Sequence, residues 1–204
     1  MAKIKTALEI ALERTESVKS DKSSIELFEL RQKGKKLANE FLAGIASIAD
    51  AMKSLESLKE EIKKESGERQ ASFKQGIFDV LISRIALPGG KDDVKLIESA
   101  GHGLHTVIGG KRFGEIVKQL VQMLNQYLGE AAQYEEGMKR QYAPKLRQKE
   151  EEIERRIGRA IKLDPFQDPE FVNFFNQNMN ALKSNYQSVL DEVREEALRL
   201  FKPV

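Results

Sequence analysis

Residues 168–200, DPEFVNFFNQNMNALKSNYQSVLDEVREEALRL, carry the clearest structural pattern in the chain. Large apolar side chains recur every three or four positions, at Val172, Phe175, Met179, Leu182, Tyr186, Val189 and Val193. That spacing places them on one face of an α-helix. Asp168 stands where it can cap the helix, and Pro169 suits the first helical position, where no amide hydrogen bond is lost. The stretch therefore predicts a long helix with one face that must be buried.

Two further long helices are predicted by the same rhythm. Between residues 23 and 65, apolar residues repeat every seven positions in two seams, Phe41, Ile48, Leu55 and Ile62 in one and Ala38, Ile45 and Met52 in the other. This spacing is typical of coiled coils and helical bundles. A helix of that length would extend about 60 Å at 1.5 Å per residue. A second stripe begins near Arg112, and Pro144 either kinks or breaks the helix that carries it.

Residues 88–112 differ in character from the rest of the chain. They contain six of the 14 glycines and both histidines. The segment from His105 to Ile108, followed by Gly109 and Gly110, can be interpreted as a strand entering a tight turn or as a loop between helices. We expect mainly irregular structure here, with at most a small β element.

Together these patterns predict an all-α fold: an elongated antiparallel hairpin or bundle of coiled-coil-like long helices with a small Gly-rich module. The N-terminal helices occupy residues 1–87 and include the long helix 23–65, and the Gly-rich module occupies 88–112. A C-terminal helical hairpin over 113–204 is expected to pack on the N-terminal helices, so that all three parts form a single structural unit.

The composition excludes several classes of protein. The 204 residues include no cysteine, which removes disulfides, thiolate catalysis and Cys-type zinc or iron–sulfur sites. No run of about 18 apolar residues is present, so we expect no membrane insertion. Charges at Glu9, Glu13 and Arg14 interrupt the first apolar stretch, where a signal peptide requires an unbroken apolar run. We therefore expect a cytoplasmic protein.

The Gly-rich segment offers a candidate anion site. Backbone amides of glycine-rich turns can hold an anion, and neighbouring cations would add attraction. The candidate residues are Gly89, Gly90, Lys91, Gly109, Gly110, Lys111 and Arg112. A phosphate-binding P-loop is not present, because Arg112 stands where the motif requires Ser or Thr. The alternative interpretation is a loop whose glycines adopt positive φ.

The same segment offers a candidate metal site. Glu98, His102 and His105 are spaced i, i+4 and i+7, so a helix would present all three on one face. Their oxygen and nitrogen atoms suit Zn²⁺ or Mn²⁺. No established zinc motif appears, and the glycines at 101 and 103 argue against a regular helix. Ordinary loop histidines are the alternative.

A basic stretch over residues 139–162 offers a candidate nucleic-acid surface. Its candidate phosphate-binding residues are Arg140, Arg147, Arg155, Arg156 and Arg159, and Tyr142 could stack on a base. Four glutamates at 150–152 and 154 lie within the stretch, and such mixed charge is typical of an exposed helix flank. A membrane-surface role has less support, since the apolar face lacks the Trp and Phe content of interfacial helices.

An aromatic cluster near the start of the last helix offers a candidate protein-docking surface, formed by Phe171, Phe174 and Phe175. The alternative is a hydrophobic plug that closes one end of the bundle. Exposure of Phe174 would distinguish the two.

These observations favour a non-enzymatic cytoplasmic scaffold, adaptor or assembly component that acts through helix packing. Its expected partner is a second copy of the chain, as a homodimer, or another helical protein, and we expect no cofactor. A nucleic-acid-associated protein is the first alternative. An enzyme or a metal- or anion-binding protein with its site in residues 88–112 is the second.

Overall fold

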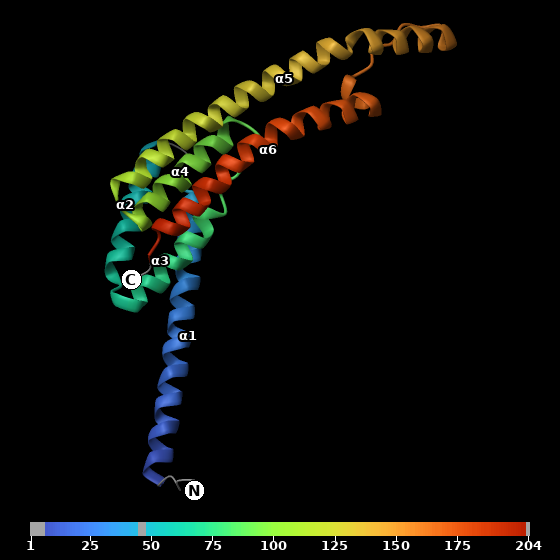
Figure 1. Ribbon diagram of the computed structural model, residues 1–204. Coiled ribbons are helices and arrows are strands. Elements are labelled where there is room, and N and C mark those ends of the chain that lie inside the picture. The colour runs from blue at the N-terminus through green and yellow to red at the C-terminus, as the bar shows by residue number, and fades with distance from the viewer. Residues whose placement is uncertain (1–6, 45–47, 203–204) are drawn as a thin grey trace. The chain divides into compact units, whose positions relative to one another are not determined.

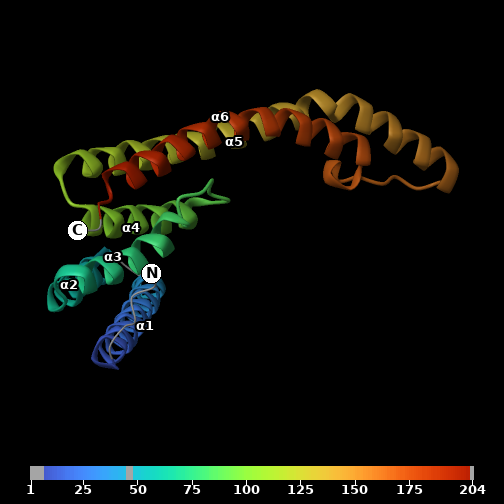
Figure 2. The same ribbon diagram turned by 60° about the horizontal axis from the view of Figure 1, so that its bottom comes forward.

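The computed structural model describes the backbone of residues 7–44 and 48–202 and the side chains of residues 23–44 and 53–202. Six α-helices and one short 3₁₀ turn make up the described chain, which contains no strand (Figures 1 and 2). The helices are α1 Ala7–Ala43, α2 Ile48–Lys64, α3 Gly67–Ile82, α4 Lys91–Ile108, α5 Lys111–Ile157 and α6 Pro169–Leu200, with the 3₁₀ turn η1 at Pro165–Gln167. The prediction of an all-α protein is confirmed.

The chain forms two compact units. Unit 1 comprises Met1–Ile85, Leu96–Val117 and Glu196–Val204, and unit 2 comprises Ala86–Lys95 and Lys118–Glu195. Each unit is assembled from stretches that are distant in sequence. Among the described helices, none combines the length and the apolar character needed to cross a membrane.

In unit 1 the backbones of α1 and α3 touch at two glycines. A Cβ added to Gly34 would lie 2.2 Å from the carbonyl oxygen of Phe73, and one added to Gly76 would lie 2.0 Å from the carbonyl oxygen of Arg31. No side chain fits at such distances, so only glycine permits the two helices to approach this closely.

Polar contacts flank this glycine crossing of α1 and α3. The hydroxyl of Ser72 donates to the carbonyl oxygen of Leu27 at 2.6 Å. On the other side, Arg31 donates to the carboxylate of Asp79 through Nε at 3.0 Å and Nη2 at 2.7 Å. Both hydrogen bonds end on the same carboxylate oxygen, Oδ2 of Asp79, so this ion pair links the side of α1 to α3.

The core of unit 1 is aliphatic and aromatic. Its largest fully buried side chains are Leu58, Phe73, Ile77, Phe78, Leu81, Ile85, Leu104, Phe113 and Val117. The ring of Phe201 stacks on Phe78 with centroids 4.3 Å apart, so the chain that follows α6 is part of this core.

Two predictions of local structure are wrong. Residues 91–108 form the regular helix α4 rather than an irregular or β-containing module. A Cβ at Gly101 would lie 2.7 Å from a methyl group of Val117, and a Cβ at Gly103 would lie 2.7 Å from a methyl group of Leu81. These glycines therefore sit in the helix because neighbouring side chains press against it. Of the six glycines in residues 88–112, only Gly109 (77°) and Gly110 (80°), in the turn between α4 and α5, adopt positive φ.

The second wrong prediction is the single long helix over residues 23–65. α1 begins at Ala7 and ends at Ala43, and a separate helix, α2, begins at Ile48. Ile45 of the predicted seam and the side chains of Ile48 and Met52 lie outside the described residues. The seven-residue repeat of apolar residues thus extends over two separate helices, α1 and α2. Heptad spacing alone therefore does not predict one continuous helix.

In unit 2, α5 and α6 pack along an apolar seam. The ring centroids of Tyr127 and Tyr186 lie 5.1 Å apart, and those of Tyr142 and Phe171 lie 5.2 Å apart. Contacts pair rising numbers on α5 with falling numbers on α6, so the two helices are antiparallel here. Pro144 lies inside α5 and does not end it.

Candidate functional site

A cluster of charged and hydroxyl groups lies where α6 begins. Asp168, directly before α6, is 7% exposed. Its Oδ1 accepts a hydrogen bond from the amide of Glu170 at 2.9 Å, which caps the helix as the sequence predicted. Its Oδ2 accepts from Nζ of Lys149 at 2.6 Å and from the hydroxyl of Tyr142 at 3.2 Å. One carboxylate thereby joins the start of α6 to two side chains of α5.

The second carboxylate of this polar cluster belongs to Glu170. Its Oε2 accepts from Nζ of Lys149 at 2.7 Å and from the hydroxyl of Tyr142 at 3.2 Å. Lys145 forms an ion pair with the same oxygen at 3.0 Å. We call the set Tyr142, Lys145, Lys149, Asp168 and Glu170 the polar cluster.

Mutual pairing sets the protonation of the polar cluster. Hydrogen bonds from Lys149 and Lys145 lower the pKa of Glu170 to about 2, and a hydrogen bond from Lys149 lowers the pKa of Asp168. Hydrogen bonds to these carboxylates raise the pKa of Lys149, and burial raises the pKa of Tyr142. Near neutral pH all four charged groups keep their charges. None of them is then poised to exchange a proton as a general acid or base.

Sequence reasoning found Asp168 and missed its partners. The usable signal was Lys149, because it occupies a position on the stripe of α5 otherwise held by Tyr142, Leu146 and Ile153. A lysine on a buried stripe indicates a carboxylate on the facing helix.

The predicted aromatic surface is mostly covered. Phe171 is fully buried, and Phe174 and Phe175 are half-buried against the seam of α5 and α6. Phe166 packs edge-on against Phe171 and Phe175, with ring centroids 5.3 Å away in both cases. This geometry supports the hydrophobic plug that was the alternative to a docking surface.

The predicted metal ligands do not converge. His102 Nε2 lies 3.9 Å from a carboxylate oxygen of Glu98, while the ring of His105 is directed to the carbonyl oxygen of Gly110 at 3.0 Å. Among the residues whose side chains are described, no group of three histidine or carboxylate side chains could hold a metal ion.

The predicted anion residues fall into two separate groups. In unit 2, the amides of Gly89 and Gly90 both donate to Oδ2 of Asp93, at 2.8 and 3.2 Å, so a carboxylate of the chain itself meets these amides. In unit 1, Arg112 pairs with Glu196 at 2.9 Å. Of the remaining candidates, Lys91 and Lys111 begin α4 and α5.

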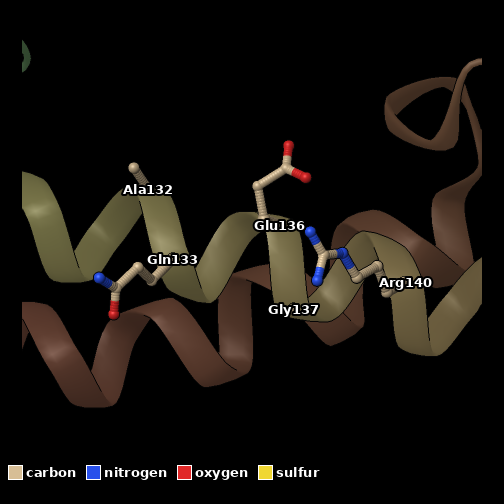
Figure 3. Close-up of a pocket in the computed structure, with 5 residues that line it drawn as sticks. All are labelled: Ala132, Gln133, Glu136, Gly137 and Arg140. Atoms are coloured by element: carbon tan, nitrogen blue, oxygen red, sulfur yellow. The ribbon is translucent and has the colours of Figure 1, made fainter.

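All five predicted nucleic-acid residues are exposed. Arg140 and Arg147 lie on α5 with glutamates nearby in sequence, and Arg140 lines a hollow together with Glu136 (Figure 3). Arg155 and Arg156 lie in the last turn of α5, and Arg159 lies in the loop beyond it. The structure thus separates the set into a mixed-charge part and a part at the end of the helix.

Two of the surface hollows in the described part of unit 2 adjoin candidate residues. The first is lined by residues of α5 alone, Ala132, Gln133, Glu136, Gly137 and Arg140 (Figure 3). The second adjoins the polar cluster and is lined by Lys149, Leu163, Asp164, Gln167, Asp168 and Pro169. Neither contains a histidine or an activated nucleophile.

Residues 59–199 match the model of a protein family described as a family of unknown function, DUF6657. The chain belongs to this family. The DUF6657 match includes α3, α4 and α5 completely and α6 except for its last residue, and it leaves out α1. Comparison with curated proteins and with solved structures gives no match.

Proposed function

We propose that this member of DUF6657 is a non-enzymatic cytoplasmic scaffold or adaptor that acts by packing helices against a partner. One observation carries the proposal. On α1, Ile25 is 58% exposed and Phe28 is 61% exposed. The two residues stand three positions apart, which places them on adjoining parts of one helix face.

The exposed pair gives the proposal an energetic basis. Burial of a large apolar side chain contributes about 1.5–3 kcal/mol before the costs of association. A partner that covers both Ile25 and Phe28 therefore gains about 3–6 kcal/mol before those costs, and contacts along the surrounding helix must supply the rest. The partner is a second copy of the chain or another helical protein.

The charged groups of unit 2 support the non-enzymatic part of the proposal. In the polar cluster, each carboxylate is paired with a lysine and each lysine with a carboxylate. Catalytic acids and bases require pKa values near the working pH, whereas here the pKa values of acids and bases move apart. This mutual pairing favours a structural role, in which the cluster holds the start of α6 against α5.

Light scattering and affinity capture with the full chain test the proposal. We expect a dimer at tens of micromolar, or a stoichiometric protein partner captured from the native cell. Phe28→Ser should weaken either association by at least tenfold, while Glu29→Ser, an exposed neighbour, should leave it unchanged. A monomer without a partner, or equal behaviour of the two variants, would contradict the proposal.

A further inference from the structure

The last turn of α5 and the loop after it present four exposed cations in unit 2, directly after the glutamates at 150–152 and 154. Residues 155–163 read RRIGRAIKL, with four cations and no carboxylate. We call this stretch the cationic tip. Gly158, at φ 71°, ends α5, and the chain then turns back toward the start of α6 (Figures 1 and 2).

The cations of the tip lack carboxylate partners. In the described part of the chain, no ion pair or hydrogen bond involves the side chains of Arg155, Arg156, Arg159 or Lys162. The lysines of the polar cluster, two turns earlier on α5, are by contrast fully paired. On the preceding turns, the carboxylate of Glu150 accepts a hydrogen bond from the amide of Leu163 at 2.7 Å. The glutamates at 151, 152 and 154 are exposed, and between these described side chains and the four cations the structure shows no ion pair.

An apolar side chain stands among these cations. Ile157 is 51% exposed, although it continues the stripe of α5 that packs on α6. In Figure 2 the last turns of α5 extend past the start of α6, and Ile157 is the last residue of α5. The half-buried Ile161 and Leu163 lie in the loop beside it.

We propose that the cationic tip docks on an anionic lipid surface. Lipid phosphates and carboxylates attract the four unpaired cations, and each cation close to such a surface strengthens binding roughly fivefold. The acyl boundary of the same surface accepts Ile157. Charge attraction and the burial of one apolar side chain together favour reversible binding at the surface of such a membrane.

A nucleic acid fits the tip less well. Its phosphates would pair with the arginines, yet they offer no apolar environment for Ile157. The stretch also contains no aromatic ring on which a base could stack.

Vesicle sedimentation with the full chain tests the proposal. We expect binding to vesicles of phosphatidylcholine mixed with phosphatidylserine, no binding to phosphatidylcholine alone, and weaker binding as salt rises. The double variant Arg156→Gln with Arg159→Gln should lose roughly 25-fold in affinity. Arg84→Gln with Lys183→Gln, two exposed cations elsewhere that give the same change of net charge, should bind like the wild type.

A third variant separates the apolar contribution from charge. Ile157→Ser keeps every charge and should weaken vesicle binding severalfold, with an unchanged circular-dichroism spectrum. Three results would overturn the proposal: no binding to mixed vesicles at low salt, equal losses in the two double variants, or no effect of Ile157→Ser. Tighter binding to duplex DNA than to the mixed vesicles, lost in Arg156→Gln with Arg159→Gln, would instead assign the tip to nucleic acid.

Discussion

In unit 1 the backbones of α1 and α3 meet directly at Gly34 and Gly76, whereas in unit 2 aromatic side chains fill the space between α5 and α6. The first contact depends on missing side chains and the second on large ones. A search for apolar periodicity detects only the second kind, because a glycine contributes nothing to a hydrophobic stripe. How closely two helices approach each other is therefore independent of how apolar their facing surfaces are.

The chain supplies an optical method for following the two units separately. It has no tryptophan, and its four tyrosines, at 127, 134, 142 and 186, all belong to unit 2. Tyrosine fluorescence therefore reports the unfolding of unit 2, while far-ultraviolet circular dichroism reports the helices of both units.

The largest effect is expected from Phe171→Ala, which removes the central ring of the aromatic seam. Phe171 is fully buried and contacts Tyr142, Phe166 and Phe175. Truncation of a buried phenylalanine costs about 3–5 kcal/mol. Urea unfolding followed by tyrosine fluorescence should show this loss. A loss below 1 kcal/mol would indicate that the ring is a docking element rather than a structural plug.

Gly76→Ala should produce the next largest effect, in unit 1. The new Cβ would begin 2.0 Å from the carbonyl oxygen of Arg31, so α1 must move. Overpacking of this kind costs about 3 kcal/mol. Circular dichroism should report the loss, with the tyrosine signal changed less than the helical signal.

The matched control for Gly76→Ala is Gly137→Ala in α5. A Cβ at Gly137 meets no atom within 4 Å. The same substitution should therefore stabilise the protein by about 0.5–1 kcal/mol, because alanine loses less backbone entropy in a helix. If both substitutions stabilised the protein, or both destabilised it, the close backbone contact at Gly76 would not distinguish unit 1 from unit 2.

A smaller loss is expected from Asp168→Ala. The change removes the cap of α6, which is worth about 1 kcal/mol, and it separates Lys149 from its buried partner. Tyrosine fluorescence in urea should detect the loss. Asp164→Ala, which affects only the 3₁₀ turn η1, should have less effect. If the two variants were equally stable, the polar cluster would have no role in holding α6.

The smallest effect is a dependence of unit 2 on acid pH. The folded protein holds the pKa of Glu170 at about 2, below its usual 4.5, and also lowers the pKa of Asp168. Their contribution to stability is therefore complete above about pH 4.5 and is lost as the pH falls toward 2. Thermal unfolding followed by tyrosine fluorescence should show this loss, and Glu170→Gln should reduce its slope. An unchanged slope in that variant would contradict the assignment.

The comparison of the units also explains what the sequence could predict. The three-and-four spacing of apolar residues sufficed to predict helices, and Asp168 followed by Pro169 sufficed to predict where α6 begins. The absence of cysteine excluded thiol chemistry directly. From the sequence alone, Gly101 and Gly103 argue against a helix, since glycine costs about 1 kcal/mol in a helix interior. In the fold that cost is offset by close packing against Val117 and Leu81, which are distant in sequence.

Site prediction was limited for a related reason. Lys149 and Asp168 are 19 residues apart, and only the register of α5 against α6 brings them to 2.6 Å. Glu98, His102 and His105 have the spacing of metal ligands on one helix face. The ring of His105, however, contacts the carbonyl oxygen of Gly110. The spacing of residues along a helix determines which face carries their side chains. The neighbouring turn determines which groups those side chains contact.

The glycine pair of unit 1 bears on the family as well as on this chain. Gly76 lies inside the stretch matched by DUF6657, while its counterpart Gly34 lies in α1, outside the match. Because the carbonyl oxygens opposite leave no space for a methyl group, the geometry predicts glycine at both positions in any relative whose N-terminal helix packs as α1 does here. A bulkier residue at the position of Gly76 would accordingly predict that a relative lacks this helix or packs it differently.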